Sequence, residues 1–277
     1  MQTFIGTSGY SYVDWCGPFY PSALDKNKML EYYAKEFSFT EINSSYYHLP
    51  SPRLFVQLSK KTPEDFIFTV KAYKSLTHER EESVKEDTKK FCFALEPLLV
   101  AGKLGAVLLQ FPYSFHNQEK NRHYLADLRE IFTKAIPVVI EFRHYSWAKK
   151  ATWDFLRSLD LGYVCVDAPK LRGLVGQETV CTTEIAYVRF HGRNSAKWWE
   201  HKHSYERYDY LYSEEEIREW APKIQNLDKE AKQVFVAFNN HYRGDTPPGM
   251  NPHGFFGYPC IVGFRSNCGV AATPLGP

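Results

Sequence analysis

The run AYVRFHG, residues 186–192, carries the pattern that decides the fold. One of its faces is apolar, while Tyr187, Arg189 and His191 alternate onto the other, as in a short buried strand. Seven further short apolar runs end on polar or charged residues. They are TFIGTS (3–8), FTEINS (39–44), IFTVKA (67–72), AVLLQF (106–111), VVIEFR (138–143), YVCVDA (163–168) and VFVAFNN (234–240).

The chain has 277 residues, and between most of these runs lie stretches long enough to form a helix. Alternating strands and helices are typical of an α/β fold with a parallel sheet, and eight such units predict a TIM (β/α)₈ barrel. We expect residues 1–241 to form this barrel domain. Helices are expected at residues 25–37, 52–58, 86–99, 121–132 and 148–159, and from Ser213, which has Glu216 at the capping-box position.

Residues 242–277 break the pattern, because they are rich in glycine and proline and show no helical periodicity. Proline lacks the backbone donor that a helix interior needs, and glycine is a poor helix former. We therefore expect an irregular C-terminal tail where the barrel would have its last helix.

The composition argues against several classes of function. Hydrophobic residues make up 44% of the chain, and the net charge of +2 is too small for bulk attraction to nucleic acid or a membrane. No apolar run approaches the roughly 18 residues of a membrane span. The six cysteines show no CxxC spacing, and the N-terminus has no signal-peptide pattern. We expect reduced thiols, no membrane association and a cytoplasmic location.

Strand periodicity also predicts which polar side chains share the inside of the barrel. The outer face of each strand packs on apolar helices, so the polar face should point inward. Besides the set in residues 187–191, this rule places eight side chains inside: Glu41, Asn43, Lys71, Gln110, Glu141, Arg143, Asp167 and Asn239. Any one of them is equally well explained by a satisfied polar network. Burying so many charges together costs several kcal/mol per ion unless they are paired, so we expect a functional site at the carboxyl ends of the strands.

The residue types indicate the chemistry of this site. The candidates for acid–base catalysis are Glu41, Glu141, Asp167 and His191. The cations that suit an anionic group, above all phosphate, are Lys71, Arg143, Arg189 and Arg193. Further substrate-binding candidates are Ser8, Tyr10, Asn43, Gln110, Trp147, Asn239 and Asn240. A divalent cation, Mg²⁺ or Mn²⁺, bound by the carboxylates is a weaker alternative, and no paired-histidine spacing indicates zinc.

Two long loops, residues 7–21 and 193–212, should lie at the same end of the barrel and are rich in aromatic residues. Long loops at a barrel mouth commonly carry binding, and aromatic rings stack on sugars or bases. The alternative, that the rings close the core beneath the loops, is about equally favoured. Lys197, Lys202 and Arg207 in the second loop slightly favour an anionic ligand.

Several motifs resemble the domain of unknown function 72 family, also called YecE-like. They are IGTSGYSYVDWCGPFYP, EINSSYYHLP, FTVKAYKSLTHE, KLGAVLLQFPYSF, IEFRHYSW, VRFHGR, YDYLYSEEEI and FNNH, within residues 4–241. The resemblance implies a TIM barrel and little about the reaction. Its shared polar positions fall on Ser8, Glu41, Asn43, Lys71, Gln110, Glu141, Arg143, Asp167, His191, Arg193, Asn239 and Asn240. The chain departs from the family pattern at Pro247, Pro248 and Gly249, where the last helix would begin.

Three functions remain open at this point. The first is an enzyme that acts on a phosphate-bearing or other small anionic substrate by acid–base chemistry, such as hydrolysis of a phosphate ester. The second is a nucleic-acid-binding barrel, by analogy of fold with metal-dependent abasic-site endonucleases. The third is a protein that binds a metabolite without converting it. The oligomeric state is left open.

Overall fold

The computed structural model of the chain describes residues 2–240, which form a closed barrel of parallel strands. The strands are β1 (Gln2–Ser8), β2 (Phe39–Ile42), β3 (Ile67–Lys71), β4 (Leu104–Gln110), β5 (Val138–Glu141), β6 (Gly162–Asp167), β7 (Ile185–Phe190) and β8 (Gln233–Phe238). Each strand pairs with its neighbours in chain order, and β8 closes the barrel onto β1. The predicted TIM-barrel fold is confirmed.

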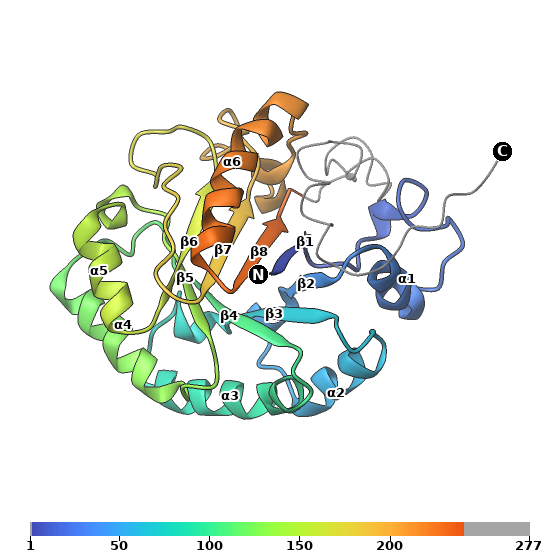
Figure 1. Ribbon diagram of the computed structural model, residues 1–277, viewed down its shortest axis with the longest axis horizontal. Helices are drawn as coiled ribbons and strands as arrows, with labels where there is room; N and C mark the ends of the chain where they lie inside the picture. Colours follow the sequence, from blue (N-terminus) through green and yellow to red (C-terminus); the bar gives the residue numbers. More distant parts are fainter. Residues whose placement is uncertain (1, 241–277) are drawn as a thin grey trace.

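The helices lie around the outside of the barrel, as Figure 1 shows. They are α1 (Met29–Glu36), α2 (Pro52–Lys60), α3 (Val84–Val100), α4 (Glu119–Ile131), α5 (Lys150–Ser158) and α6 (Glu214–Glu230). The short 3₁₀ helices are η1 (Val13–Trp15), η2 (Lys26–Lys28), η3 (Ser44–Tyr46), η4 (Lys74–Leu76), η5 (Tyr145–Trp147) and η6 (Ser204–Tyr208).

All the helices expected from the sequence are present, and α6 begins with the predicted capping box between Ser213 and Glu216. The connection from β6 to β7, residues 168–184, contains no helix. Within residues 2–240, no helix combines the length and apolar character needed to cross a bilayer. The four cysteines of this part of the chain are free. The expected irregular tail, residues 242–277, lies outside the described residues.

Contacts between strands that are not neighbours identify the inner face of the barrel. The Tyr187 hydroxyl on β7 reaches Glu41 on β2 at 2.8 Å and Thr69 on β3 at 2.7 Å, which is only feasible across the interior. Residues paired across parallel strands share a face. The inner-face pairs are Ser8 with Glu41, Glu41 with Thr69, Lys71 with Leu108, Gln110 with Glu141, Val166 with Arg189, and Arg189 with Ala237.

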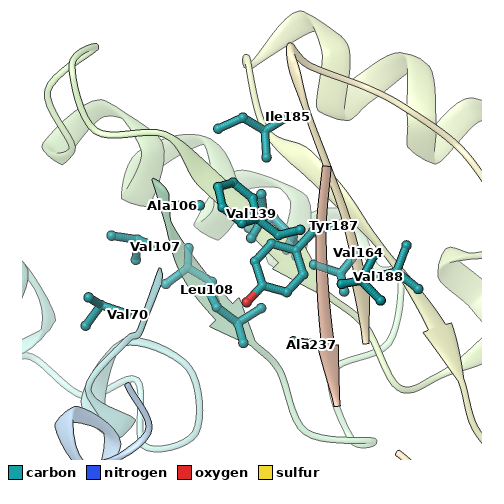
Figure 2. Close-up of a cluster of buried hydrophobic side chains, with 14 of the residues drawn as sticks. Val70, Ala106, Val107, Leu108, Val139, Val164, Ile185, Tyr187, Val188 and Ala237 are labelled. Atoms are coloured by element: carbon teal, nitrogen blue, oxygen red, sulfur yellow. The ribbon is translucent and has the colours of Figure 1, made fainter. Parts of the chain in front are cut away.

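Aromatic side chains fill the amino-terminal end of the barrel. The Phe235 ring lies 5.0 Å from Phe4 and 5.2 Å from Phe39, between ring centroids. Above them, Figure 2 shows the Tyr187 ring among aliphatic side chains that include Val164 and Leu108. The polar inner positions therefore gather at the carboxyl end, over a closed apolar floor.

Gly6 allows β1 and β2 to approach each other closely. A Cβ atom at this position would lie 2.1 Å from the carbonyl oxygen of Phe39, far inside any real contact. The strand could not carry a larger residue there without moving, so Gly6 fixes where Ser8 stands relative to Glu41.

Candidate active site

Arg189 lies at the centre of a buried ion-pair network that connects three strands. Its side chain is 1% exposed, and it donates to Glu141 Oε2 at 2.5 Å and to Glu41 Oε1 at 2.6 Å. The same guanidinium lies 3.4 Å from Ser8 Oγ. The other oxygen of Glu41 accepts the hydrogen bond from Tyr187. Both carboxylates are therefore paired within the barrel, as buried charges require.

Of the two inner carboxylates, Glu141 has more side-chain partners than Glu41. Its Oε1 forms an ion pair with Arg143 Nη2 at 2.9 Å and accepts from His191 Nε2 at 3.1 Å, in addition to the bond from Arg189 to Oε2. Burial by itself would raise the pKa of Glu141, but the charges of Arg143 and Arg189, with His191, hold this pKa well below its ordinary value. Glu141 stays ionised at neutral pH.

His191 is a neutral side chain with both ring nitrogens engaged. Burial, together with the charge of Arg143, lowers its pKa to about 3. An ionised Glu141 only accepts hydrogen bonds, so Nε2 carries the proton and Nδ1 accepts from Asn239 Nδ2 at 3.0 Å. This pair of contacts fixes the tautomer and the orientation of the ring.

Arg143 has one half of its guanidinium unused. Nη2 is bound to Glu141, but the buried Nη1 has no hydrogen-bond partner in the part of the chain that the structure describes. The residue is 8% exposed, and its Cζ lies 5.8 Å from the centroid of the Trp198 ring. A buried cationic donor without an acceptor is destabilising, and an oxygen of a bound anion would satisfy it.

Lys71 lies at the end of β3 and is bound by neutral groups. Its Nζ donates to Gln110 Oε1 at 2.9 Å and lies 4.6 Å from the centroid of the Tyr46 ring. Burial and the charge of Arg189 lower its pKa to about 7, although the nearby carboxylates oppose this shift. At neutral pH the amine and the ammonium are both populated.

His78 belongs to the same group of side chains, although strand periodicity could not place it. It lies in the loop after β3, its ring is 5.1 Å from Tyr46, and its Nδ1 is 2.9 Å from Thr77 Oγ1. Burial, with the charges of Lys71 and Arg143, lowers its pKa to about 4. The one sequence signal for this residue is its position in the motif FTVKAYKSLTHE, since no strand parity extends to it.

The long loop after β7 lies over this end of the barrel. Trp198 is buried beside Arg143, and the Tyr208 ring lies 5.9 Å from the ring of His191. Gly192, with φ of +83°, turns the chain out of the strand directly after His191. Aromatic rings from this loop thus contact two of the site residues.

Asp167 does not point into the barrel, so that prediction is wrong. Its neighbour Val166 shares the inner face with Arg189, and Asp167 shares the outer face with Phe190. There its carboxylate accepts from Trp220 Nε1 at 2.6 Å, from the Tyr212 hydroxyl at 2.7 Å and from Arg193 Nη2 at 2.8 Å. The buried carboxylate is thus held by donors from α6 and the preceding loop.

Arg193 shares this outer environment. Besides Asp167, it pairs with Glu216 at 3.1 Å and Glu219 at 2.9 Å on α6. Three carboxylates already surround it, which argues against the predicted role in holding an anionic substrate.

Trp147 also lies outside the site, contrary to prediction. It is fully buried, stacks on Phe142 at 4.2 Å between centroids, and donates to the carbonyl oxygen of Phe115 at 2.6 Å. Phe142 follows Glu141 and faces the helices, so Trp147 is part of the outer core. At Trp147, the alternative interpretation is correct: the ring closes the core beneath the loops.

The other predicted residues lie around the described site. Asn43 is half-buried after β2, and its Oδ1 has no partner within residues 2–240. Asn240 is buried and donates to the Tyr210 carbonyl at 2.9 Å. Tyr10 packs against Tyr33 of α1, with 6.2 Å between ring centroids, and its contribution to binding stays a prediction. Among residues 2–240, no group of three or more His, Cys, Asp or Glu side chains could hold a metal ion.

Comparisons with known proteins agree with this architecture. The model of the family described as "Protein of unknown function DUF72" matches residues 4–251. The UPF0759 protein YunF of Bacillus subtilis (strain 168) is 32% identical over 261 residues, which cover 87% of this chain and 90% of YunF.

Solved structures of similar proteins have the same fold. A DUF72 family protein from Thermotoga maritima MSB8 is 40% identical, with a TM-score of 0.84, and the match covers 95% of this chain and 100% of that chain. A DUF72 family protein from Enterococcus faecalis V583 is 25% identical, with a TM-score of 0.79, over 100% of this chain and 98% of the other. The chain therefore belongs to the DUF72 family, as its motifs indicated.

Proposed function

We propose that this protein binds a small anionic molecule at the carboxyl end of the barrel and acts on it by acid–base chemistry. The observation that carries the proposal is the buried Nη1 of Arg143, which has no hydrogen-bond partner among residues 2–240. A guanidinium with one edge anchored on Glu141 and the other edge open is suited to an oxygen of a phosphate or a carboxylate.

The balance of charge supports an anionic ligand. Within the group of charged side chains that acts on Lys71, the cations Arg143, Arg189 and Lys71 face the carboxylates Glu41 and Glu141. With Lys71 protonated, one positive charge is left without a counter-charge. A bound anion would neutralise this charge.

Lys71 is the group best suited to move a proton. General acid–base catalysis is most effective when the pKa of the catalyst lies near the working pH, and the pKa of Lys71 is about 7. Glu141 and His191, which we expected to transfer protons, have pKa values far below neutrality and are engaged on all sides. Their contacts favour a positioning role, in which Glu141 holds Arg143 and His191 orients Glu141.

Titration of the full-length protein with inorganic phosphate, followed by calorimetry, tests the binding. Arg143→Gln should weaken phosphate binding by roughly tenfold or more, because a charge-assisted hydrogen bond contributes about 1.5–3 kcal/mol. Arg218→Gln is the matched control, since Arg218 pairs with Glu214 on the surface of α6. Equal affinities in the wild type and Arg143→Gln would contradict the proposal.

Incubation with a mixture of phosphate- and carboxylate-bearing metabolites, followed by mass spectrometry, tests the chemistry. Conversion that is lost in Lys71→Met supports an enzyme. Retention of a compound without conversion supports the non-catalytic metabolite-binding alternative. No contact in the described residues specifically favours nucleic acid, since Lys197 lies 3.6 Å from Glu206 and Arg207 is bound to His201.

A further inference from the structure

We infer that Lys71 forms an imine with the carbonyl group of an anionic oxo compound, that is, an oxo acid or a phosphate ester of a ketone or aldehyde. This inference rests on the proposed function, because Arg143 must hold the anionic group of the same molecule. It adds the class of substrate and a covalent step to that proposal.

The contacts of Lys71 leave its amine available for addition to a carbonyl group. No carboxylate of the described residues lies within 4.0 Å of Nζ, and its hydrogen-bond acceptor is the neutral amide of Gln110. A lysine at a barrel interior is ordinarily paired with an acid. Here both nearby carboxylates, Glu41 and Glu141, are already bound by arginines.

The surroundings of Lys71 also favour its neutral form. The charged groups that act on Lys71 come from several strands. Arg189 and Arg143 lower its pKa, whereas Glu41 and Glu141 raise it. Burial dominates, so the pKa is about 7 compared with 10.5 for an ordinary lysine. The neutral amine is therefore roughly a thousandfold more populated at pH 7 than in an exposed lysine.

The chemistry balances with groups that the site and the solvent supply. The lone pair of Nζ forms a bond to the carbonyl carbon, and the carbonyl oxygen takes up protons and leaves as water. One proton from the solvent is consumed, and the nitrogen becomes a positively charged iminium. Neither an oxidant nor a reductant is required.

The product of this step suits the site as well as the amine does. The Tyr46 ring, 4.6 Å from Nζ, would face the iminium charge, and Gln110 Oε1 would accept its N–H. Lys71 is bound to Gln110, which pairs in register with Glu141, the carboxylate that holds Arg143, so an anion on the open edge of Arg143 would lie near the reacting nitrogen. An anionic group and a carbonyl in one small molecule would match this pair.

Reductive trapping tests the inference. The full-length protein is incubated at pH 7 with pyruvate or dihydroxyacetone phosphate and sodium cyanoborohydride, and the modified peptide is identified by mass spectrometry. We expect a single reduced adduct on Lys71 with at least one probe. Lactate and glycerol 3-phosphate carry the same anionic groups but no ketone. They should compete with the probe for the site and reduce the amount of adduct.

Lys223 provides a matched control within the same protein. Its Nζ also has an amide acceptor, Gln177 Oε1 at 3.2 Å, and an aromatic ring, Trp220 at 4.5 Å, but it lies on α6 outside the barrel. Lys223→Arg should keep the adduct, and Lys71→Arg should lose it. If Lys71→Arg does not fold, the ratio of adducts on Lys71 and Lys223 in the wild type gives the same answer.

The outcomes separate the inference from the proposed function. If the alcohol analogues bind and require Arg143, but no adduct forms on Lys71, the imine is refuted and the anion site stands. If no anion binds, the proposed function fails and the inference fails with it. Equal labelling of Lys71 and Lys223 would show that the amine has no special reactivity and would overturn the inference.

Discussion

Replacement of Arg189 by methionine should be strongly destabilising. The guanidinium neutralises two buried carboxylates, Glu41 at 2.6 Å and Glu141 at 2.5 Å, and methionine fills a similar volume without the charge. Removing one partner of a buried ion pair costs about 3–5 kcal/mol, because the other charge remains in a medium of low dielectric constant.

The size of the effect follows from the partners that remain. After the change, Glu141 still has Arg143 and His191, whereas among residues 2–240 Glu41 keeps only the hydroxyl of Tyr187. Glu41 should therefore account for most of the loss. Since proteins are typically stable by about 5–15 kcal/mol, Arg189→Met should remove a large part of the stability. The unfolding temperature should fall by roughly 6–20 °C.

Urea and thermal unfolding followed by circular dichroism measure this loss. Arg218→Met, which breaks a surface pair with Glu214, should change the stability by less than about 1 kcal/mol. Adding Glu41→Gln to Arg189→Met should recover part of the loss, because it removes the uncompensated charge. The reasoning would be refuted if Arg189→Met were no more destabilising than Arg218→Met, or if the second change gave no recovery.

Three further predictions concern other positions. Asp167→Ala should lower the unfolding free energy by about 3–5 kcal/mol in urea titrations, because it leaves the buried donors around Asp167 unpaired. Phosphate affinity should not change, and a weakened affinity would show that Asp167 contributes to the anion site. Gly6→Ala should prevent soluble expression or strongly lower the unfolding temperature, because its Cβ would clash with Phe39. Lys71→Met should be more stable than the wild type at pH 6, with an advantage that shrinks toward pH 10. The pKa of Lys71 is about 7 when folded, so between about 7 and 10.5 only the unfolded chain binds its proton, and wild-type stability rises with pH. A difference in unfolding temperature that does not depend on pH would contradict this.

Strand parity predicted the centre of the site because the relevant strands have one polar and one apolar face. In β7, Arg189 and His191 alternate with Val188 and Phe190, and the structure places the polar pair inside. The same contrast identified Lys71 beside Val70. A barrel strand buries both of its faces, and its outer face packs on apolar helices. A strand with one polar and one apolar face therefore fits only with the polar face inward.

The rule failed at Asp167 because β6 is apolar on both faces, so its residues do not show which face turns inward. The register does, since Gly162 pairs with Val139 and Val166 with Arg189. The outer carboxylate is tolerated there because the connection to β7 lacks a helix and α6 supplies Trp220 as a donor. Trp220 lies 53 residues after Asp167 in the sequence, so no local pattern could have predicted this contact.

The two levels of the site explain why so many charges can be buried while one group stays reactive. In the deeper level, Arg189 pairs with both Glu41 and Glu141, and these contacts hold its geometry without a ligand. Glu141 extends this order upward by fixing one edge of Arg143, so the other edge is presented without further reorganisation. Burial lowers the pKa of Lys71, and within this level Arg189 lowers it further while Glu41 and Glu141 oppose the shift. The network below thus presents the open donor, and burial of Lys71 favours its neutral amine, and a ligand with an anion and a carbonyl would use both together.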